Sequence, residues 1–349
     1  MHGDGQQRTL LERRPLPTQR AHQCISQSGM QIRLSGQHPR GLALAASRGE
    51  LRQRDTEVMP ELPEVETVRR GLLATVLGWR VESVEVLSKQ SLAAPGPALD
   101  RQLVGRRLAA VARRGKLLIV DLDSDAHLWV HLMMTGQLVV TEHGRTLFGG
   151  GHPSRSMLAP MPNVTTRVVL RLSGDRSLYF NDARKFGRIR LLSTAELEAD
   201  PFLARLGPEP LGDSFTLAGF RSQLQRHRRA PTKPVILDQS VLAGIGNIYA
   251  DESLHLARLH PRRQAGSLSM AESRRLHEAI RTVIGQAIEH GGTSFADYVN
   301  AARGQVGYLE QARVFRREGQ PCPVCGTPIE RIRVAGRSTN ICTHCQRAP

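Results

Sequence analysis

The chain has 349 residues, 40% of them hydrophobic, which is enough for two or three domains with buried cores. Its apolar runs are interrupted well short of a membrane span, so we expect a soluble protein without a transmembrane helix. Lys and Arg total 48 against 32 Asp and Glu, and the net charge of +16 predicts a polyanionic partner, although an ordinary basic enzyme is an alternative. Aromatic residues make up only 4%, which disfavours a protein that stacks successive bases of a single strand and favours contact with a duplex backbone.

Residues 1–58 contain nine Arg, five acidic residues and repeated Gln without a helical or strand period. We expect this extension to be disordered or untranslated. A helix is predicted directly after Met59. Pro63 and Glu64 suit its first turn, hydrophobic residues follow at helical spacing, and Gly78 closes it.

Short apolar or alternating segments then predict strands at residues 81–87, 116–122, 128–132, 166–172, 177–180 and 187–192. Such a series is typical of an antiparallel β-sandwich. The Gly149–Gly151 cluster, with prolines as far as Pro162, predicts a long surface loop inside this domain. A Gly/Pro-rich segment at residues 206–212 predicts a hinge into a mainly helical region at residues 213–300.

The segment Met59-Pro60-Glu61 offers a nucleophile if translation starts at Met59. Removal of the methionine would free the secondary amine of Pro60, and an α-amino group has a pKa of about 8. This amine can attack a sugar carbon and form an iminium, whereas the same nitrogen inside a peptide bond is an amide without a usable lone pair. Glu61 could shuttle protons beside it. On pattern alone, a helix that begins with proline and acidic residues explains the segment better.

Two further segments suggest contact with a nucleic acid. In Gly244-Ile245-Gly246-Asn247, a turn before a helix could grip a phosphate with its amides and the Asn247 side chain, but tight helix packing explains the glycines equally well. In the segment from Asp182 to Gly187, Phe186 stands among basic residues and could fill the stack left by a flipped nucleotide. Without further context, core packing of Phe186 is the default explanation.

The C-terminal cysteines form two pairs, Cys322-x-x-Cys325 and Cys342-x-x-Cys345, separated by sixteen residues. Four thiolates at this spacing predict one tetrahedral Zn²⁺, and because all four ligand positions are filled the site should be structural. A redox or disulfide role is the less favoured alternative. Arg337 follows Gly336 in the intervening segment, where a hairpin turn would point a guanidinium toward phosphate or simply toward solvent.

These segments, in this order, resemble the formamidopyrimidine-DNA glycosylase family, and the similarity covers nearly all of residues 59–347. The resemblance implies a multidomain α+β fold in which damaged duplex DNA binds between an antiparallel β-sandwich with a leading helix and a helix–two-turn–helix domain with a zinc finger. We therefore expect a catalytic sandwich at 59–192, a hinge at 193–212, a helix–two-turn–helix domain at 213–313 and the zinc finger at 314–347.

The resemblance also assigns roles to single residues. Pro60 is the nucleophile at the deoxyribose anomeric carbon, Glu61 the general acid/base for sugar-ring opening, and Lys116 a phosphate contact that could also donate a proton. The DNA-binding residues it implies fall into three groups: Asn247 and Arg337 as a phosphate clamp; Met134, Arg184 and Phe186 as void fillers that face the orphaned base; and Lys233 near the base pocket.

The implied reaction removes oxidised purines such as 8-oxoguanine and formamidopyrimidines, then cleaves the abasic strand by β,δ-elimination. It needs damaged double-stranded DNA and one structural zinc ion, with no redox cofactor or catalytic metal. We expect a monomer without membrane association, in the bacterial cytoplasm with the nucleoid.

Three departures from the family pattern, Met133, Ala183 and Lys185, predict a different placement of the void-filling loop. The segment at residues 163–167 lacks the usual histidine, and the loop at 291–309, which in the family closes over the damaged base, diverges at residues 301–306, so the base preference stays open. One alternative is the related endonuclease VIII branch, which prefers oxidised pyrimidines and usually carries Gly where Leu62 stands. Another is a non-catalytic, zinc-stabilised DNA-binding protein, which would result if the extension were retained.

Overall fold

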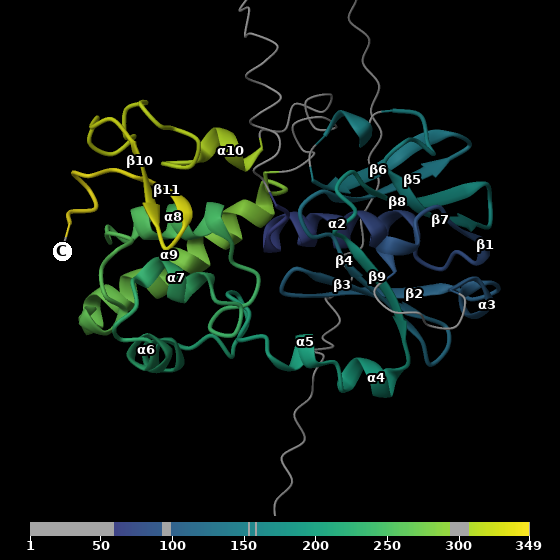
Figure 1. Cartoon of the computed structure of the whole chain (residues 1–349), viewed down its shortest axis with the longest axis horizontal. Coiled ribbons are helices and arrows are strands. Elements are labelled where there is room, and N and C mark those ends of the chain that lie inside the picture. The colour runs from purple at the N-terminus through teal and green to yellow at the C-terminus, as the bar shows by residue number, and fades with distance from the viewer. Residues whose placement is uncertain (1–58, 93–98, 153, 158, 294–306, 349) are drawn as a thin grey trace, which may run out of the picture. The chain divides into compact units, whose positions relative to one another are not determined.

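Helix α2 (Leu62–Thr75) opens the part of the chain that the computed structural model describes (Figure 1). The structure describes residues 59–92, 99–152, 154–157, 159–293 and 307–348, which belong to one compact unit. The helix starts with proline in its first turn, where a missing N–H leaves no hydrogen bond unmade. Val65, Val68 and Leu72 line its fully buried face. The predicted leading helix is confirmed.

Two antiparallel sheets follow and enclose a common core to which α2 contributes (Figure 1). The five-stranded sheet has the order β1-β7-β8-β5-β6 and the four-stranded sheet the order β2-β3-β4-β9. Short helices η2 (Lys89–Ser91), α3 (Leu99–Leu103) and η3 (Arg155–Met157) lie between strands. The strands are β1 (Val81–Val86), β2 (Leu108–Arg114), β3 (Leu117–Leu122), β4 (His127–His131), β5 (Gly136–Glu142), β6 (Arg145–Gly151), β7 (Thr166–Leu172), β8 (Arg176–Asp182) and β9 (Arg188–Leu192).

The predicted β-sandwich is confirmed, but the prediction of a loop at Gly149–Gly151 is wrong. These glycines end strand β6, against which α2 packs. A Cβ on Gly150 would lie 2.7 Å from a methyl carbon of Val68, and a Cβ on Gly71 would lie 2.0 Å from the Phe148 ring. The glycines therefore allow close packing of helix and strand rather than chain reversal.

Strands β2 and β5 were also not predicted from the sequence. Six of the seven residues of β5 are buried, because Val139 on its outer face is covered by a second cluster with Met157 and Tyr179. A strand buried on both faces has no alternation of polar and apolar residues to reveal it.

The predicted helical region is confirmed as far as Thr293, and residues 294–306 lie outside the described part of the chain. Two short helices, α4 (Thr194–Glu198) and α5 (Pro201–Ala204), precede it. Helices α6 (Leu217–Arg226), α7 (Thr232–Leu237), α8 (Asn247–Leu256), α9 (Met270–Glu289) and α10 (Tyr308–Gln311), with the short turn η4 (Ala265–Ser267), surround a second core that also includes Leu62.

The hairpin of β10 (Glu330–Val334) and β11 (Arg337–Ile341) completes the described chain and contacts α8 through β11. Its two-residue turn, Ala335-Gly336, has positive φ angles of 47° and 78°, as tight hairpin turns require. Among the described helices none is long and apolar enough to cross a membrane.

Candidate active site and metal centre

The candidate active site forms where the start of α2 meets the start of α8. The Leu62 amide donates to the carbonyl of Gly244 at 3.0 Å, and the Ile248 amide donates to Glu61 Oε1 at 3.0 Å. A Cβ on Gly246 would lie 2.2 Å from Glu61 Cδ. The glycines before α8 thus serve close packing, the explanation that the sequence left open, and the Ile248 amide is occupied by Glu61 rather than free for a phosphate.

Glu61 is almost completely buried, and its second carboxylate oxygen, Oε2, has no hydrogen-bond partner among the described residues. Burial raises the pKa of Glu61 to about 7, although the nearby charge of Lys116 lowers it in part. A carboxyl group that titrates near neutral pH can both give and take a proton under cellular conditions. Glu61 therefore has the protonation behaviour and the unoccupied oxygen that a general acid/base needs.

Lys116 stands at the turn between β2 and β3, directly after Gly115 with φ +58°. Its side chain is buried, which lowers its pKa, while Glu61 and Glu64 act in the opposite direction. Glu209 holds the turn, because its carboxylate accepts the Gly115 amide at 2.5 Å and pairs with the two arginines before it. The turn thus fixes the lysine within electrostatic reach of Glu61.

Glu64 is a site residue that the sequence analysis treated only as a helix-start acid. Its carboxylate accepts the Glu61 amide at 2.9 Å, the Tyr249 hydroxyl at 2.5 Å, and the Thr293 amide and hydroxyl at 2.7 and 2.9 Å. A Cβ on Gly292 would lie 2.6 Å from it. The spacing of three residues between Glu61 and Glu64, typical of a capping box, was the available signal.

The two proposed clamp residues lie at the ends of separate elements. Asn247 is the first residue of α8, and its Oδ1 is buried without a partner among the described residues. Arg337 is exposed at the start of β11, where the hairpin turn was expected to place it. Burial lowers the pKa values of both Lys116 and Lys233, and the charge of Arg337 lowers them further.

The Lys233 side chain has three partners inside the protein, and its expected place near a base pocket stays a prediction. Its side chain is 0% exposed, and its ammonium group pairs with Asp251 at 2.6 Å and donates to the Ser338 carbonyl at 2.9 Å and the Thr339 hydroxyl at 2.7 Å. An ammonium group has three protons, and these three acceptors account for them. Lys233 thus holds the β11 strand that carries Arg337.

The three proposed void fillers come from two neighbouring loops. Met134 is half-buried in the turn between β4 and β5, whereas Arg184 and Phe186 are exposed in the loop between β8 and β9. The Arg184 guanidinium lies 4.8 Å from the centre of the Phe186 ring, a cation–π contact. Beside them is an open depression of about 500 Å³, lined by Gln90, Leu92, Arg184, Lys185, Phe186 and Arg188.

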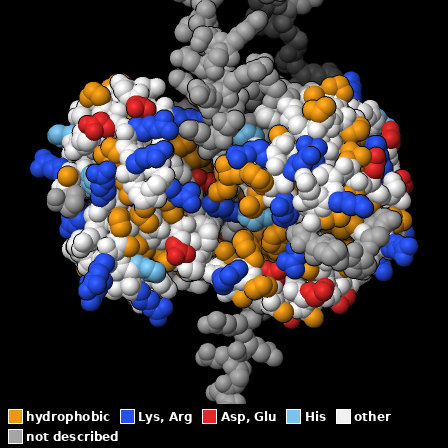
Figure 2. Space-filling view, viewed as in Figure 1, with side chains coloured by type: hydrophobic (Ala, Val, Ile, Leu, Met, Phe, Trp, Pro, Cys, Tyr) orange, Lys and Arg blue, Asp and Glu red, His pale blue; other side chains and the backbone are white. Residues whose placement is uncertain are grey.

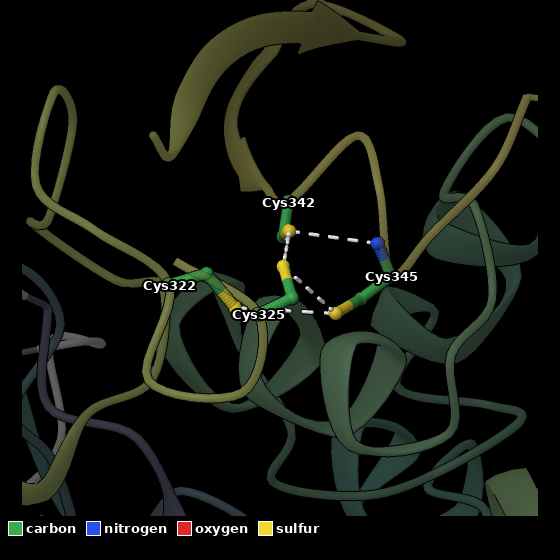
Figure 3. Close-up of side chains that lie close together, drawn as sticks. All are labelled: Cys322, Cys325, Cys342 and Cys345. Atoms are coloured by element: carbon green, nitrogen blue, oxygen red, sulfur yellow. Dashed lines mark hydrogen bonds between the residues drawn. The ribbon is translucent and has the colours of Figure 1, made fainter. Parts of the chain in front are cut away.

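The four cysteine sulfurs lie within 4.8 Å of one another (Figure 3). Sγ of Cys325 is 3.4 Å from that of Cys342 and 3.5 Å from that of Cys345, and Cys322 and Cys345 are 4.0 Å apart. A zinc ion with Zn–S bonds of about 2.3 Å separates its four sulfurs by about 3.8 Å. The donor set and its spacing therefore fit one structural zinc ion.

Helix α8 supports this metal centre with three buried side chains that the sequence analysis did not single out. His255 Nε2 lies 3.4 Å from Cys322 Sγ. The Glu252 carboxylate accepts the amides of residues 313, 314 and 315 at 2.8 to 2.9 Å, just before the first cysteine pair. Asp251 accepts the Asn340 amide of β11 at 2.8 Å. The helix that begins at Asn247 thus also fixes the zinc-binding hairpin.

Family models match three consecutive parts of the chain. The formamidopyrimidine-DNA glycosylase N-terminal domain matches residues 59–189, the H2TH domain of the same glycosylase matches 206–298, and the zinc finger found in FPG and IleRS matches 319–348.

Whole proteins match as well. The formamidopyrimidine-DNA glycosylase of Heliobacterium modesticaldum is 43% identical over 290 residues, which are 83% of this chain and 100% of that protein. Lactococcus lactis FPG in complex with Fapy-dG containing DNA matches with a TM-score of 0.71 and 31% identity over 82% of this chain and 100% of the other. The same enzyme with an abasic site containing DNA gives a TM-score of 0.72 and 32% identity at the same coverage. The chain therefore belongs to the formamidopyrimidine-DNA glycosylase family.

Proposed function

We propose that the protein is a bifunctional DNA glycosylase and abasic-site lyase of base-excision repair, which removes 8-oxoguanine and formamidopyrimidines from duplex DNA. The observation that carries this proposal is the buried Glu61 carboxyl, directly after Pro60, with one oxygen that has no partner in the described part of the chain and with the charge of Lys116 acting on it. Family membership and the Fapy-dG and abasic-site DNA bound by the Lactococcus enzyme support the same substrate class.

In the proposed reaction the Pro60 nitrogen attacks the anomeric carbon of the damaged nucleotide. The new carbon–nitrogen bond replaces the bond to the base, which leaves with its electron pair and takes up the proton that the Pro60 nitrogen loses. Glu61 gives a proton to the ring oxygen as the sugar opens to the iminium, and β,δ-elimination then releases both phosphates. This nucleophile requires a chain that begins at Pro60. The family match begins at residue 59, and 83% of this chain covers the whole length of the Heliobacterium relative.

The DNA duplex is proposed to lie against basic side chains of both the sandwich and the helical region. Lys and Arg side chains are spread over both parts on the face shown in Figure 2. Lys116, Asn247 and Arg337 would contact phosphates beside the lesion, and Met134, Arg184 and Phe186 would fill the void. We assign catalysis to the domain at residues 59–192, a hinge to 193–212, and DNA binding to the helix–two-turn–helix domain at 213–313 and the zinc finger at 314–347. Because one chain supplies every group, we propose a monomer that acts on chromosomal DNA in the bacterial cytoplasm.

Excision assays under single-turnover conditions test this substrate choice. The zinc-loaded chain that begins at Pro60 is mixed with a duplex containing 8-oxoguanine opposite cytosine, or with one containing thymine glycol. We expect faster excision of 8-oxoguanine, and no excision by a Pro60→Gly variant that retains Met59. Activity on thymine glycol alone would instead identify an endonuclease VIII-like enzyme, and binding without any excision would identify a non-catalytic DNA-binding protein.

A further inference from the structure

The two loops that carry the void-filling residues are joined through one buried carboxylate, that of Asp182. Its Oδ1 accepts the Thr135 hydroxyl and the Arg184 amide, the latter at 3.1 Å, and its Oδ2 accepts the Gly187 amide at 2.6 Å. The Thr135 hydroxyl oxygen also accepts the Arg184 amide at 3.0 Å. Asp182 is 0% exposed. Thr135 follows Met134, and the Arg184 and Gly187 amides flank Phe186, so this carboxylate connects both loops.

Each of the two loops contains one residue in a backbone conformation that residues other than glycine rarely adopt. Met133, next to Met134, has φ 52°, and Lys185, between Arg184 and Phe186, has φ 58°. A residue other than glycine in this left-handed region costs about 1 kcal/mol or more, and it persists only where surrounding contacts impose it. The Met133 amide donates to Nδ1 of buried His131 at 3.0 Å, which fixes the start of the first turn. The turn is closed by the Gly136 amide, which donates to the Leu132 carbonyl at 2.8 Å, and Asp182 and Thr135 join this turn to both ends of the second loop.

Close packing around Asp182 leaves the carboxylate little freedom. A Cβ on Gly187 would lie 2.6 Å from the Phe180 ring and 3.0 Å from Asp182 Oδ2. The Asp182 backbone is held as well, since its amide donates to the Thr165 carbonyl at 2.8 Å and it pairs with Gly136 in the ladder between β5 and β8. The carboxylate therefore presents its acceptors at fixed positions.

We propose that Asp182 and Thr135 fix the Met134 turn and the Arg184–Phe186 loop relative to each other, so that Met134, Arg184 and Phe186 enter the duplex together. We call this pair of residues the latch. The inference rests on the proposed function and adds two positioning residues to it. Neither residue touches the reacting atoms. Fixing the loops in advance removes the cost of ordering them separately at each damaged base, and a misplacement of about 1 Å can slow a reaction by about 100-fold.

The test compares Thr135→Val, which keeps the side-chain shape and removes the hydroxyl, with Thr135→Ser, which keeps the hydroxyl. Thr141→Val makes the same change at a buried threonine within β5 and serves as the matched control. Each zinc-loaded protein is assayed for excision from a duplex with 8-oxoguanine opposite cytosine and for cleavage at a preformed abasic site in single-stranded DNA, where no partner base has to be displaced. Fluorescence of 2-aminopurine placed opposite the lesion reports entry of the void fillers.

We expect Thr135→Val to slow excision by roughly 10- to 100-fold and to reduce the fluorescence change, with single-strand cleavage altered by less than about twofold. Thr135→Ser should restore both signals, and Asp182→Asn should resemble Thr135→Val. The proposed latch is contradicted if Thr135→Val has the same excision rate as Thr141→Val, or if Thr135→Val slows duplex excision and single-strand cleavage by the same factor. A wild-type protein that neither excises nor cleaves would contradict the proposed function itself.

Discussion

At the scale of single residues, the most informative group is the Glu61 carboxyl. The Glu61 amide donates to the Glu64 carboxylate, and Glu61 Oε1 accepts the Ile248 amide. Burial raises the pKa of the Glu61 carboxyl to about 7. A buried carboxyl with a raised pKa favours the protonated form in the folded state more strongly than in the unfolded state. It therefore costs stability once the pH exceeds its unfolded value.

Replacing Glu61 by Gln should make this cost visible. Between the ordinary pKa of 4.5 and the folded value of about 7, the unfolded chain loses its proton first, so wild-type stability falls as the pH rises through this window. The unfolding free energy of Glu61→Gln, relative to that of the wild type, should therefore rise by about 2 kcal/mol between pH 5 and pH 8. Urea unfolding at both pH values measures this difference.

Glu82→Gln, which changes an exposed carboxyl of β1, is the control for the loss of one negative charge. A Glu61→Gln effect that stays constant with pH, or that matches this control, would show that burial does not shift the titration of Glu61.

At the scale of elements, the contact between the starts of α2 and α8 depends on missing side chains. Gly246→Ala would put a methyl carbon within 2.2 Å of Glu61 Cδ. We expect a loss of about 1 to 3 kcal/mol in unfolding free energy, as for other overpacked sites, together with a loss of excision activity because Glu61 is displaced. Denaturant unfolding and the 8-oxoguanine assay check both.

Gly285 in the middle of α9 provides the matched control, because a Cβ there would meet nothing within 4 Å. Gly285→Ala should raise the unfolding free energy by about 0.5 to 1 kcal/mol and leave excision unchanged. Equal effects of the two substitutions would mean that close packing at Gly246 is unimportant.

Helix α8 also connects the candidate active site with the zinc centre, through His255 at its C-terminal end. A neutral imidazole whose Nε2 donates to the Cys322 thiolate would lower the charge density on that sulfur and hold it in place. His255→Phe should speed the release of zinc to a chromogenic chelator by roughly tenfold, without changing the stoichiometry of one zinc per chain. His277→Phe, in α9 and stacked on Phe215, is the control, and equal release rates for the two variants would remove His255 from the metal centre.

At the scale of the whole molecule, the sequence was sufficient for the fold class, the leading helix, the helical region and the four zinc ligands. These have local signals: helical spacing of apolar residues and two Cys-x-x-Cys pairs. Strands β5 and β6 lacked such a signal, because β5 is buried on both faces and the glycines of β6 serve contact with α2. The sequence of a Gly-rich segment does not show whether its glycines form a turn or allow another element to pack closely against them.

The candidate site shows the same limit. Pro60, Glu61, Lys116, Asn247 and Arg337 could be proposed because each belongs to a recognisable motif. The buried partners that fix them could not, since Glu64 reaches Thr293 and Glu209 reaches Gly115 over long sequence separations. The three acceptors of Lys233 could not be predicted from its motif either, since they lie on α8 and β11.

The proposed catalysis depends on where the chain starts. In the 349-residue chain, Pro60 follows Met59 and its nitrogen belongs to a peptide bond, so the proposed chemistry requires that residues 1–59 be absent. The most direct measurement is mass spectrometry of the tryptic peptides after borohydride reduction with 8-oxoguanine duplex DNA. We predict a DNA adduct on the peptide of residues 60–69 in the chain that begins at Pro60, and no adduct in the full-length chain. An adduct on a lysine such as Lys116, or an adduct formed by the full-length chain, would contradict the assignment of Pro60 as the nucleophile.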